Sequence, residues 1–163
     1  MSREPPLEGD DDLLLAIYRI GRLMGSRQVS ARIADAAGAT VTKQGVQVLR
    51  ALYRFGQRQI ADLASLAHMD VAAVSRQLRE LEDTGLVTRA PVAADGRAAL
   101  VSLTPSGRRI AKRIRDVGLL HLTNALQDWD PRERSELARL LSKLVDDLMN
   151  TGITPVDRST RVG

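Results

Sequence analysis

The residues with the clearest capacity for chemistry lie on a short segment between positions 71 and 82. Val74, Leu78 and Leu81 recur there at the spacing of one helix face. At about 100° per residue, the opposite face presents small and cationic side chains. These are Ala72, Arg76 and Arg79, with Ala73 and Ser75 on the flanks. An exposed face of this kind suits contact with base edges in a DNA major groove.

Each of these side chains has an expected role in DNA contact. Arg76 is the candidate for guanine, because a guanidinium can donate to two acceptors of one base. Ala72 and Ala73 let the helix approach closely and can touch a thymine methyl, while Ser75 is a candidate polar contact. Arg79 is expected on phosphate. The alternative is a solvated face on which nearby Glu80 and Glu82 accompany both arginines.

A second candidate contact is Arg97, which follows Asp95 by two positions. Asp95-Gly96 is a turn signal in a polar loop between two short apolar segments, and it predicts a β-hairpin. An arginine at the hairpin tip can enter a narrow A·T-rich minor groove, where negative potential is concentrated, with Asp95 orienting it. The alternative is a surface arginine paired with Asp95.

Thr42 and Lys43 begin another expected helix. The free backbone N–H groups of a helix start attract phosphate, which makes both residues candidates for DNA contact. Simple N-capping by Thr42 explains the pattern equally well.

The sequence shows no catalytic or metal-binding constellation. It has no cysteine and only two histidines, His68 and His121, and it lacks a phosphate loop and a nucleophile elbow. We therefore expect no enzymatic activity, no metal and no cofactor. His121 lies on an apolar stripe, where it either lines a ligand pocket or titrates as a pH-sensitive group. A hydrogen-bonded interface histidine is the reading we favour.

Regular helices and a hairpin are needed to position these residues. Asp12, Thr42 and Asp70 are the expected N-caps, because their side-chain oxygens accept backbone N–H groups. Gly38, Gly56, Gly85 and Gly152 are the expected stops. The pattern predicts helices over 12–37, 42–56, 60–67, 71–84, 105–127 and 131–151, and strands over 86–89 and 99–103.

The last of these helices carries a regular apolar stripe: Leu137, Leu140, Leu141, Leu144, Val145 and Leu148. The helices over 12–37 and 105–127 carry similar stripes. Two arrangements satisfy the pattern, because the three helices can pack on one another or on the same helices of a second chain.

Composition excludes several functional classes. Aromatic residues make up 2% of the chain, which counts against stacking of single-stranded bases. The absence of cysteine fits a reducing cytoplasm, and no apolar run approaches the length of a membrane span. Acids dominate residues 1–12, where a secretory signal needs bases. The net charge of +4 permits nucleic-acid binding, and residues 105–127 alone carry five bases and one acid.

The order of these segments resembles the MarR family of bacterial transcription regulators over roughly residues 12–150. The motifs that carry the resemblance are LEDTGLVTR, DGR and LTPSG, together with a leucine-striped last helix after Pro-Arg-Glu. The resemblance implies a homodimer in which the terminal helices form the interface and each chain presents one winged helix. It also implies tuning by a small ligand bound near the junction of the two parts.

Two positions depart from the family pattern. Arg58-Gln59 precedes the helix at Ile60 where a capping Ser or Thr is usual. Ala98 follows Arg97 where a second basic residue is common, so we expect a weaker grip of the wing on DNA.

We therefore predict a mostly helical α+β fold: a winged helix–turn–helix with a two-stranded wing, flanked by N- and C-terminal dimerisation helices. The DNA-binding lobe is expected over 40–104, the dimerisation lobe over 12–38 and 105–151, and loose tails over 1–11 and 152–163. The predicted function is sequence-specific binding of double-stranded DNA by a cytoplasmic homodimer on a palindromic operator, typical of a repressor that a small effector releases. The alternatives are a winged-helix protein-interaction module and a non-specific architectural DNA binder.

Overall fold

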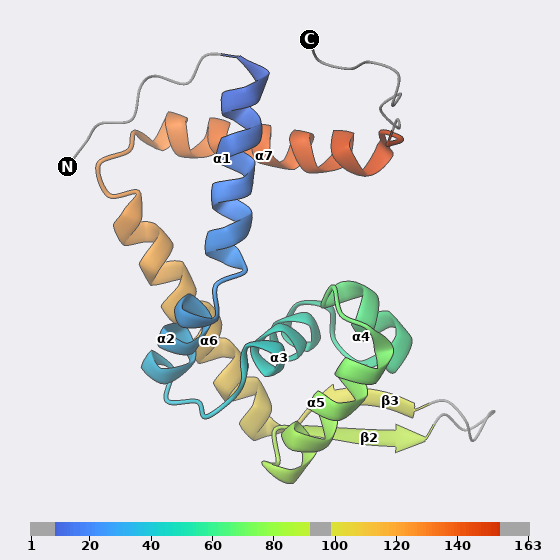
Figure 1. Ribbon diagram of the computed structural model, residues 1–163. Helices are drawn as coiled ribbons and strands as arrows, with labels where there is room; N and C mark the ends of the chain where they lie inside the picture. Colours follow the sequence, from blue (N-terminus) through green and yellow to red (C-terminus); the bar gives the residue numbers. More distant parts are fainter. Residues whose placement is uncertain (1–8, 92–98, 154–163) are drawn as a thin grey trace. The chain divides into compact units, whose positions relative to one another are not determined.

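The computed structural model describes residues 9–91 and 99–153, and it is mostly helical with one small antiparallel sheet (Figure 1). Within these residues no helix is long and apolar enough to cross a membrane. The elements are α1 (Asp10–Met24), α2 (Arg27–Ala36), α3 (Lys43–Phe55), β1 (Arg58–Gln59), α4 (Ile60–Leu66), α5 (Val71–Asp83), β2 (Val87–Pro91), β3 (Ala99–Leu103), α6 (Pro105–Ala125) and α7 (Pro131–Asn150).

The single helix predicted over 12–37 is wrong, because the structure divides it into α1 and α2. The break falls at Gly25-Ser26, where the Ser26 side chain accepts the Val29 N–H at 3.3 Å and caps α2. Glycine is a poor helix former and serine is a good N-cap, so this pair favours a new start over continuation. The helix also begins at Asp10 with Gly9 as its N-cap, so Asp12 is not the cap.

The three helices of the helix–turn–helix unit begin and end largely where the sequence predicts. Thr42 caps α3 by accepting the Gly45 N–H at 3.1 Å, and Asp70 caps α5 by accepting the Ala73 N–H at 2.7 Å. The tight turn between α4 and α5 places His68 in the left-handed region with φ of 51°. These caps fix where α5 begins and therefore which residues occupy its first turns.

One apolar core holds these helices and the sheet together. Its largest fully buried side chains come from α3, α4, α5, β3 and α6, and they are Val46, Val48, Leu49, Leu52, Leu63, Val74, Leu78, Leu81, Val101 and Ile114. Burial of a side chain of this size stabilises the fold by about 1.5–3 kcal/mol. The core therefore anchors α5 by its inward face and leaves its other face free.

The sheet has three strands in the order β1-β3-β2, so the predicted two-stranded wing is incomplete. Arg58 pairs with Val101 and Gln59 with Leu100, which adds β1 to the edge of the hairpin. Gln59 makes no side-chain cap for α4. This explains why no Ser or Thr precedes Ile60: Arg58 and Gln59 pair with β3 at the place where a capping side chain was expected.

The start of α6 is joined closely to the end of α5. The Thr104 hydroxyl donates to the Gly85 carbonyl at 2.7 Å and accepts the Gly107 N–H at 3.0 Å. A Cβ on Gly107 would lie 1.8 Å from the Leu86 carbonyl oxygen, far inside van der Waals contact. The glycine of LTPSG therefore has a steric cause at Gly107, and its threonine, Thr104, lies three residues earlier because it accepts the Gly107 N–H.

Contacts divide the chain into two compact units, residues 1–121 and 122–163. The second unit contains α7, which has a complete capping box: Asp130 accepts the Arg132 N–H at 2.7 Å, and Glu133 accepts the Asp130 N–H at 2.8 Å. None of the residues of α7 is buried. The predicted DNA-binding and dimerisation lobes are defined by their expected functions and not by contacts, so that division remains a prediction.

Gly107→Ala should destabilise the protein by about 1–3 kcal/mol, because the added methyl forces α6 away from the Leu86 backbone. The matched control is Gly118→Ala on the same helix, where a Cβ would lie 3.5 Å from the Arg50 guanidinium in ordinary contact. That control should be neutral or stabilising by up to about 1 kcal/mol, since alanine favours helix. Urea unfolding measures both, and equal midpoints for the two variants would contradict the steric account.

Candidate nucleic-acid interface

The two faces of α5 are those predicted from the sequence. Val74, Leu78 and Leu81 are completely buried or nearly so. Ala72, Arg76 and Arg79 are exposed, and Ala73 and Ser75 are partly exposed. The structure therefore brings all five candidate contacts of this helix to its outer surface, within its first three turns.

The acidic neighbours of this face are committed to other groups. Glu80 accepts a hydrogen bond from the Gln77 side chain at 2.7 Å, and Glu82 forms an ion pair with Arg89 of β2 at 2.9 Å. Among the described residues, Arg76 and Arg79 have no ion pair and no side-chain hydrogen bond. Glu80 and Glu82 thus form no ion pair with Arg76 or Arg79 among the described residues, and both DNA contact and a solvated face remain compatible with this arrangement.

Arg89 has the structural role that its place at the base of the hairpin suggests. Its Nε atom lies 2.9 Å from a Glu82 carboxylate oxygen, and both side chains are less than one-third exposed. The pair joins the last turn of α5 to β2, so the hairpin and the helix are held together by a partly desolvated ion pair as well as by the core.

The tip of the hairpin lies outside the described residues, and with it Asp95 and Arg97. The strands that carry it are in regular register, with Val87 opposite Leu103 and Pro91 opposite Ala99. The minor-groove role of Arg97 remains a prediction.

Thr42 and Lys43 make intramolecular contacts in this structure. Besides capping α3, the Thr42 hydroxyl donates to Gln77 Oε1 at 2.5 Å, and the Lys43 ammonium donates to the Gly25 carbonyl at 2.5 Å. The capping role of Thr42 is confirmed. Phosphate binding by these two residues remains a prediction.

Gln77 is a residue of this site that the sequence analysis does not identify. It lies on the inward side of α5 and is 7% exposed. The available signal was its spacing, three residues after Val74 and one before Leu78, which places an amide on the core side of the helix. An analysis of apolar periodicity overlooks such a residue, because it counts only the apolar residues of the buried face and Gln77 is polar.

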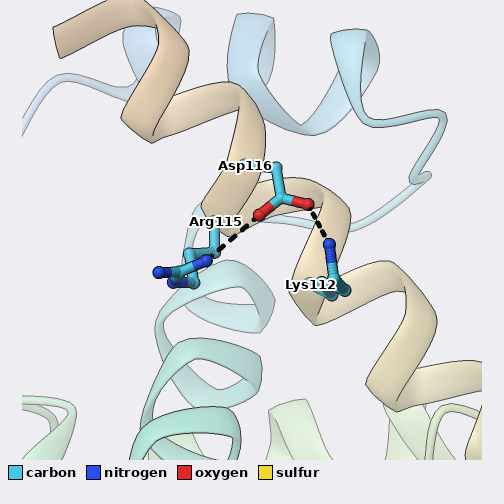
Figure 2. Close-up of polar contacts among 3 residues, drawn as sticks. All are labelled: Lys112, Arg115 and Asp116. Carbon is cyan, nitrogen blue, oxygen red and sulfur yellow. Dashed lines mark hydrogen bonds and ion pairs between the residues drawn. The ribbon is translucent and has the colours of Figure 1, made fainter. Parts of the chain in front are cut away.

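The basic run of α6 is partly neutralised on its own helix. Figure 2 shows Asp116 accepting hydrogen bonds from Lys112 at 2.5 Å and Arg115 at 3.2 Å. The hydrogen bond and charge of Lys112 lower the pKa of Asp116, and the same bond raises the pKa of Lys112. These ion pairs lie on the exposed surface, where such pairs contribute little to stability.

His121 lies at a shallow cleft between α2 and α6. The cleft has a volume of about 260 Å³ and is lined by apolar side chains, with Arg32 and His121 as its polar groups. The residues that line it are Val29, Arg32, Ile33, Ala36, Val117 and His121. Within the described ranges no group of three or more His, Cys, Asp or Glu side chains could hold a metal ion.

Comparison with known proteins identifies the same architecture. The MarR family model matches residues 40–98. An HTH-type transcriptional repressor of Mycobacterium tuberculosis is 31% identical over 141 residues, covering 86% of this chain and 99% of the relative. A solved MarR family regulator from Silicibacter pomeroyi has a TM-score of 0.67 at 26% identity, covering 85% and 92% of the two chains. A MarR regulator from Methanosarcina mazei has the same fold, with a TM-score of 0.68 at 19% identity over 85% and 95%.

The chain belongs to the MarR family of winged helix–turn–helix transcription regulators. It is a DNA-binding transcriptional regulator, and its family is not a class of enzymes.

Proposed function

We propose that this protein is a cytoplasmic, homodimeric repressor that reads a palindromic operator with α5. The observation that carries the proposal is the exposed face of α5, where Arg76 and Arg79 stand among small residues and both nearby glutamates are engaged elsewhere. An exposed guanidinium that has no ion pair within the protein can donate charge-assisted hydrogen bonds to base or phosphate acceptors. The repressor function is supported by the name of the Mycobacterium tuberculosis relative.

The homodimer is supported by large apolar side chains that a single chain leaves in water. In the first unit α1 exposes Leu13, Leu14, Leu15, Tyr18, Ile20, Leu23 and Met24, and α6 exposes Leu119 and Leu120. In the second unit α7 exposes Leu140, Leu141, Val145, Leu148 and Met149. Exposed apolar surface on this scale marks an interaction surface. A second copy of the chain would bury it.

A two-fold dimer implies an operator with two-fold symmetry. Each chain would place one α5 in a major groove, so the half-sites would lie about one helical turn, roughly 10 bp, apart or a multiple of that. Arg76 with Ala72, Ala73 and Ser75 would read bases. Arg79 and the helix start at Thr42-Lys43 would contact phosphate and set the register.

Arg76→Ala should weaken operator binding by about 1–3 kcal/mol and relax preference at one base position in each half-site. The matched control is Arg79→Ala on the same face, which should weaken operator and random DNA alike and reduce the salt dependence of binding by about one phosphate contact. Titrations of both duplexes at several salt concentrations distinguish the two roles. An equal loss on operator and random DNA for Arg76→Ala would contradict base reading.

Arg97→Ala should weaken binding mainly to operators whose flanks are A·T-rich, because a narrow minor groove attracts arginine. Competition between operators with A·T-rich and G·C-rich flanks measures the effect. An unchanged flank preference would refute the minor-groove role of Arg97 and of Asp95, its proposed orienting partner.

We further propose that a small effector releases the protein from DNA by binding the cleft at His121. Its apolar walls and the cation of Arg32 favour a small apolar anion, such as an aromatic or aliphatic carboxylate. A carboxylate panel added to the protein–operator complex should include compounds that release DNA, and Arg32→Gln should weaken that release. Full retention of DNA by every compound at millimolar concentration would contradict the effector role.

Two other functions are tested by the same titrations. Equal affinity for unrelated duplexes would identify an architectural binder. No affinity for any duplex would favour a protein-interaction module, for which Val71 at the start of α5 is the exposed large apolar side chain of the described helix.

A further inference from the structure

Gln77 is the only buried polar or charged side chain among the residues that the structure describes. It follows Arg76 directly on α5, yet it faces α3 and is too deeply buried to contact DNA. A buried amide is retained at little cost only when its hydrogen-bonding groups are satisfied. Its partners therefore indicate what it does.

The Gln77 amide joins two elements through a chain of hydrogen bonds with one consistent direction. The Thr42 hydroxyl donates to Gln77 Oε1 at 2.5 Å, and Gln77 Nε2 donates to Glu80 Oε2 at 2.7 Å. The hydroxyl also accepts the Gly45 N–H at 3.1 Å, which uses its acceptor side and directs its single proton to Gln77. A flipped amide would place Oε1 against the Glu80 carboxylate, so the chain has one favourable arrangement.

Gly45 lies beside this contact. It is buried in the first turn of α3, and a Cβ there would lie 3.5 Å from Gln77 Nε2 and 3.4 Å from the Val41 Cβ. The amide of Gln77 thus lies near the first turn of α3.

We propose that Gln77 is a positioning residue that fixes the rotation of α5 about its own axis, and so the aim of Arg76, through its hydrogen bond to Thr42. The inference rests on the proposed base-reading function of α5. Apolar contacts are non-directional, so Val74, Leu78 and Leu81 hold α5 against the core but tolerate small rotations. A hydrogen bond is directional and weakens steeply when it is misaligned. Thr42 therefore acts on sequence discrimination through Gln77.

The test compares Gln77→Met and Thr42→Val with the conservative control Thr42→Ser. Methionine matches glutamine in length and is apolar, and the released Thr42 and Glu80 groups are exposed enough to bond water, so this variant should fold. Thr42→Val removes the donor of the Thr42–Gln77 hydrogen bond, and it keeps the proposal testable if Gln77→Met does not fold. For each variant, affinities for the selected operator and for a random duplex of equal length are measured at one salt concentration, beside the urea midpoint.

We expect Gln77→Met to lower the ratio of operator to random affinity by about tenfold, with little change on random DNA, because a misaimed Arg76 loses a base contact while phosphate contacts persist. Thr42→Val should lower this ratio to the same extent, and the loss of any phosphate contact made by Thr42 itself would fall on both duplexes alike and leave the ratio unaffected. Thr42→Ser should keep the wild-type ratio. The double variant of Gln77→Met and Thr42→Val should have the same ratio as Gln77→Met alone, because both substitutions remove the same Thr42–Gln77 hydrogen bond.

Two results would overturn the inference in distinguishable ways. If the wild-type protein discriminates and folded Gln77→Met discriminates equally, with only a lower urea midpoint, Gln77 is structural and the proposed function stands. If the wild-type protein shows no preference for any duplex, the proposed function fails and the positioning role fails with it.

Discussion

The packing of α5 against α3 is the constraint on which the rest of this structure depends. It buries Val74, Leu78 and Leu81 in the common core and so determines which side of α5 faces water. The caps at Thr42 and Asp70 set where the two helices begin, and the Glu82–Arg89 pair ties the far end of α5 to the sheet. Because these contacts all act on the inner face and the ends of α5, its outer face is left with small side chains and two arginines. We propose this face as the DNA-contacting surface of this MarR-family regulator.

The distribution of acids determines which cations remain available for DNA. On α6, Asp116 engages Lys112 and Arg115, and on α7, Glu136 engages Arg139. Near α5 the acids are engaged inward or sideways, by Gln77 and Arg89. The net charge of +4 alone therefore says little about where DNA binds. The proposed location on α5 rests on the exposed face of that helix and on its two arginines, which have no ion pair among the described residues.

Much of the fold could be predicted because it follows from local rules. The stripes of α5 and α7 and the caps at Thr42 and Asp70 each depend on residues within one or two helical turns. The features that the sequence analysis missed depend on competition between local signals or on contacts with residues far away in the sequence. At Gly25-Ser26 a start signal overrides an apolar stripe that continues through it. A two-residue strand such as β1 has no period of its own and exists only because β3 pairs with it. Gln77 pairs with Thr42 across 35 positions, a distance at which sequence spacing carries no information. The outward residues of α5 could be predicted because Val74, Leu78 and Leu81 define the buried face of the helix, and the helix period then defines the opposite face.

Recovery of bound fragments from the source genome tests the central claim most directly. The protein is mixed with sheared genomic DNA at physiological salt and excess random competitor, and the retained fragments are sequenced. A reading helix presented twice by a two-fold dimer predicts a shared inverted repeat with half-sites about 10 bp, or a multiple of that, from centre to centre. Fragments retained without any shared motif would contradict sequence reading by α5, and a shared motif without two-fold symmetry would contradict the homodimer.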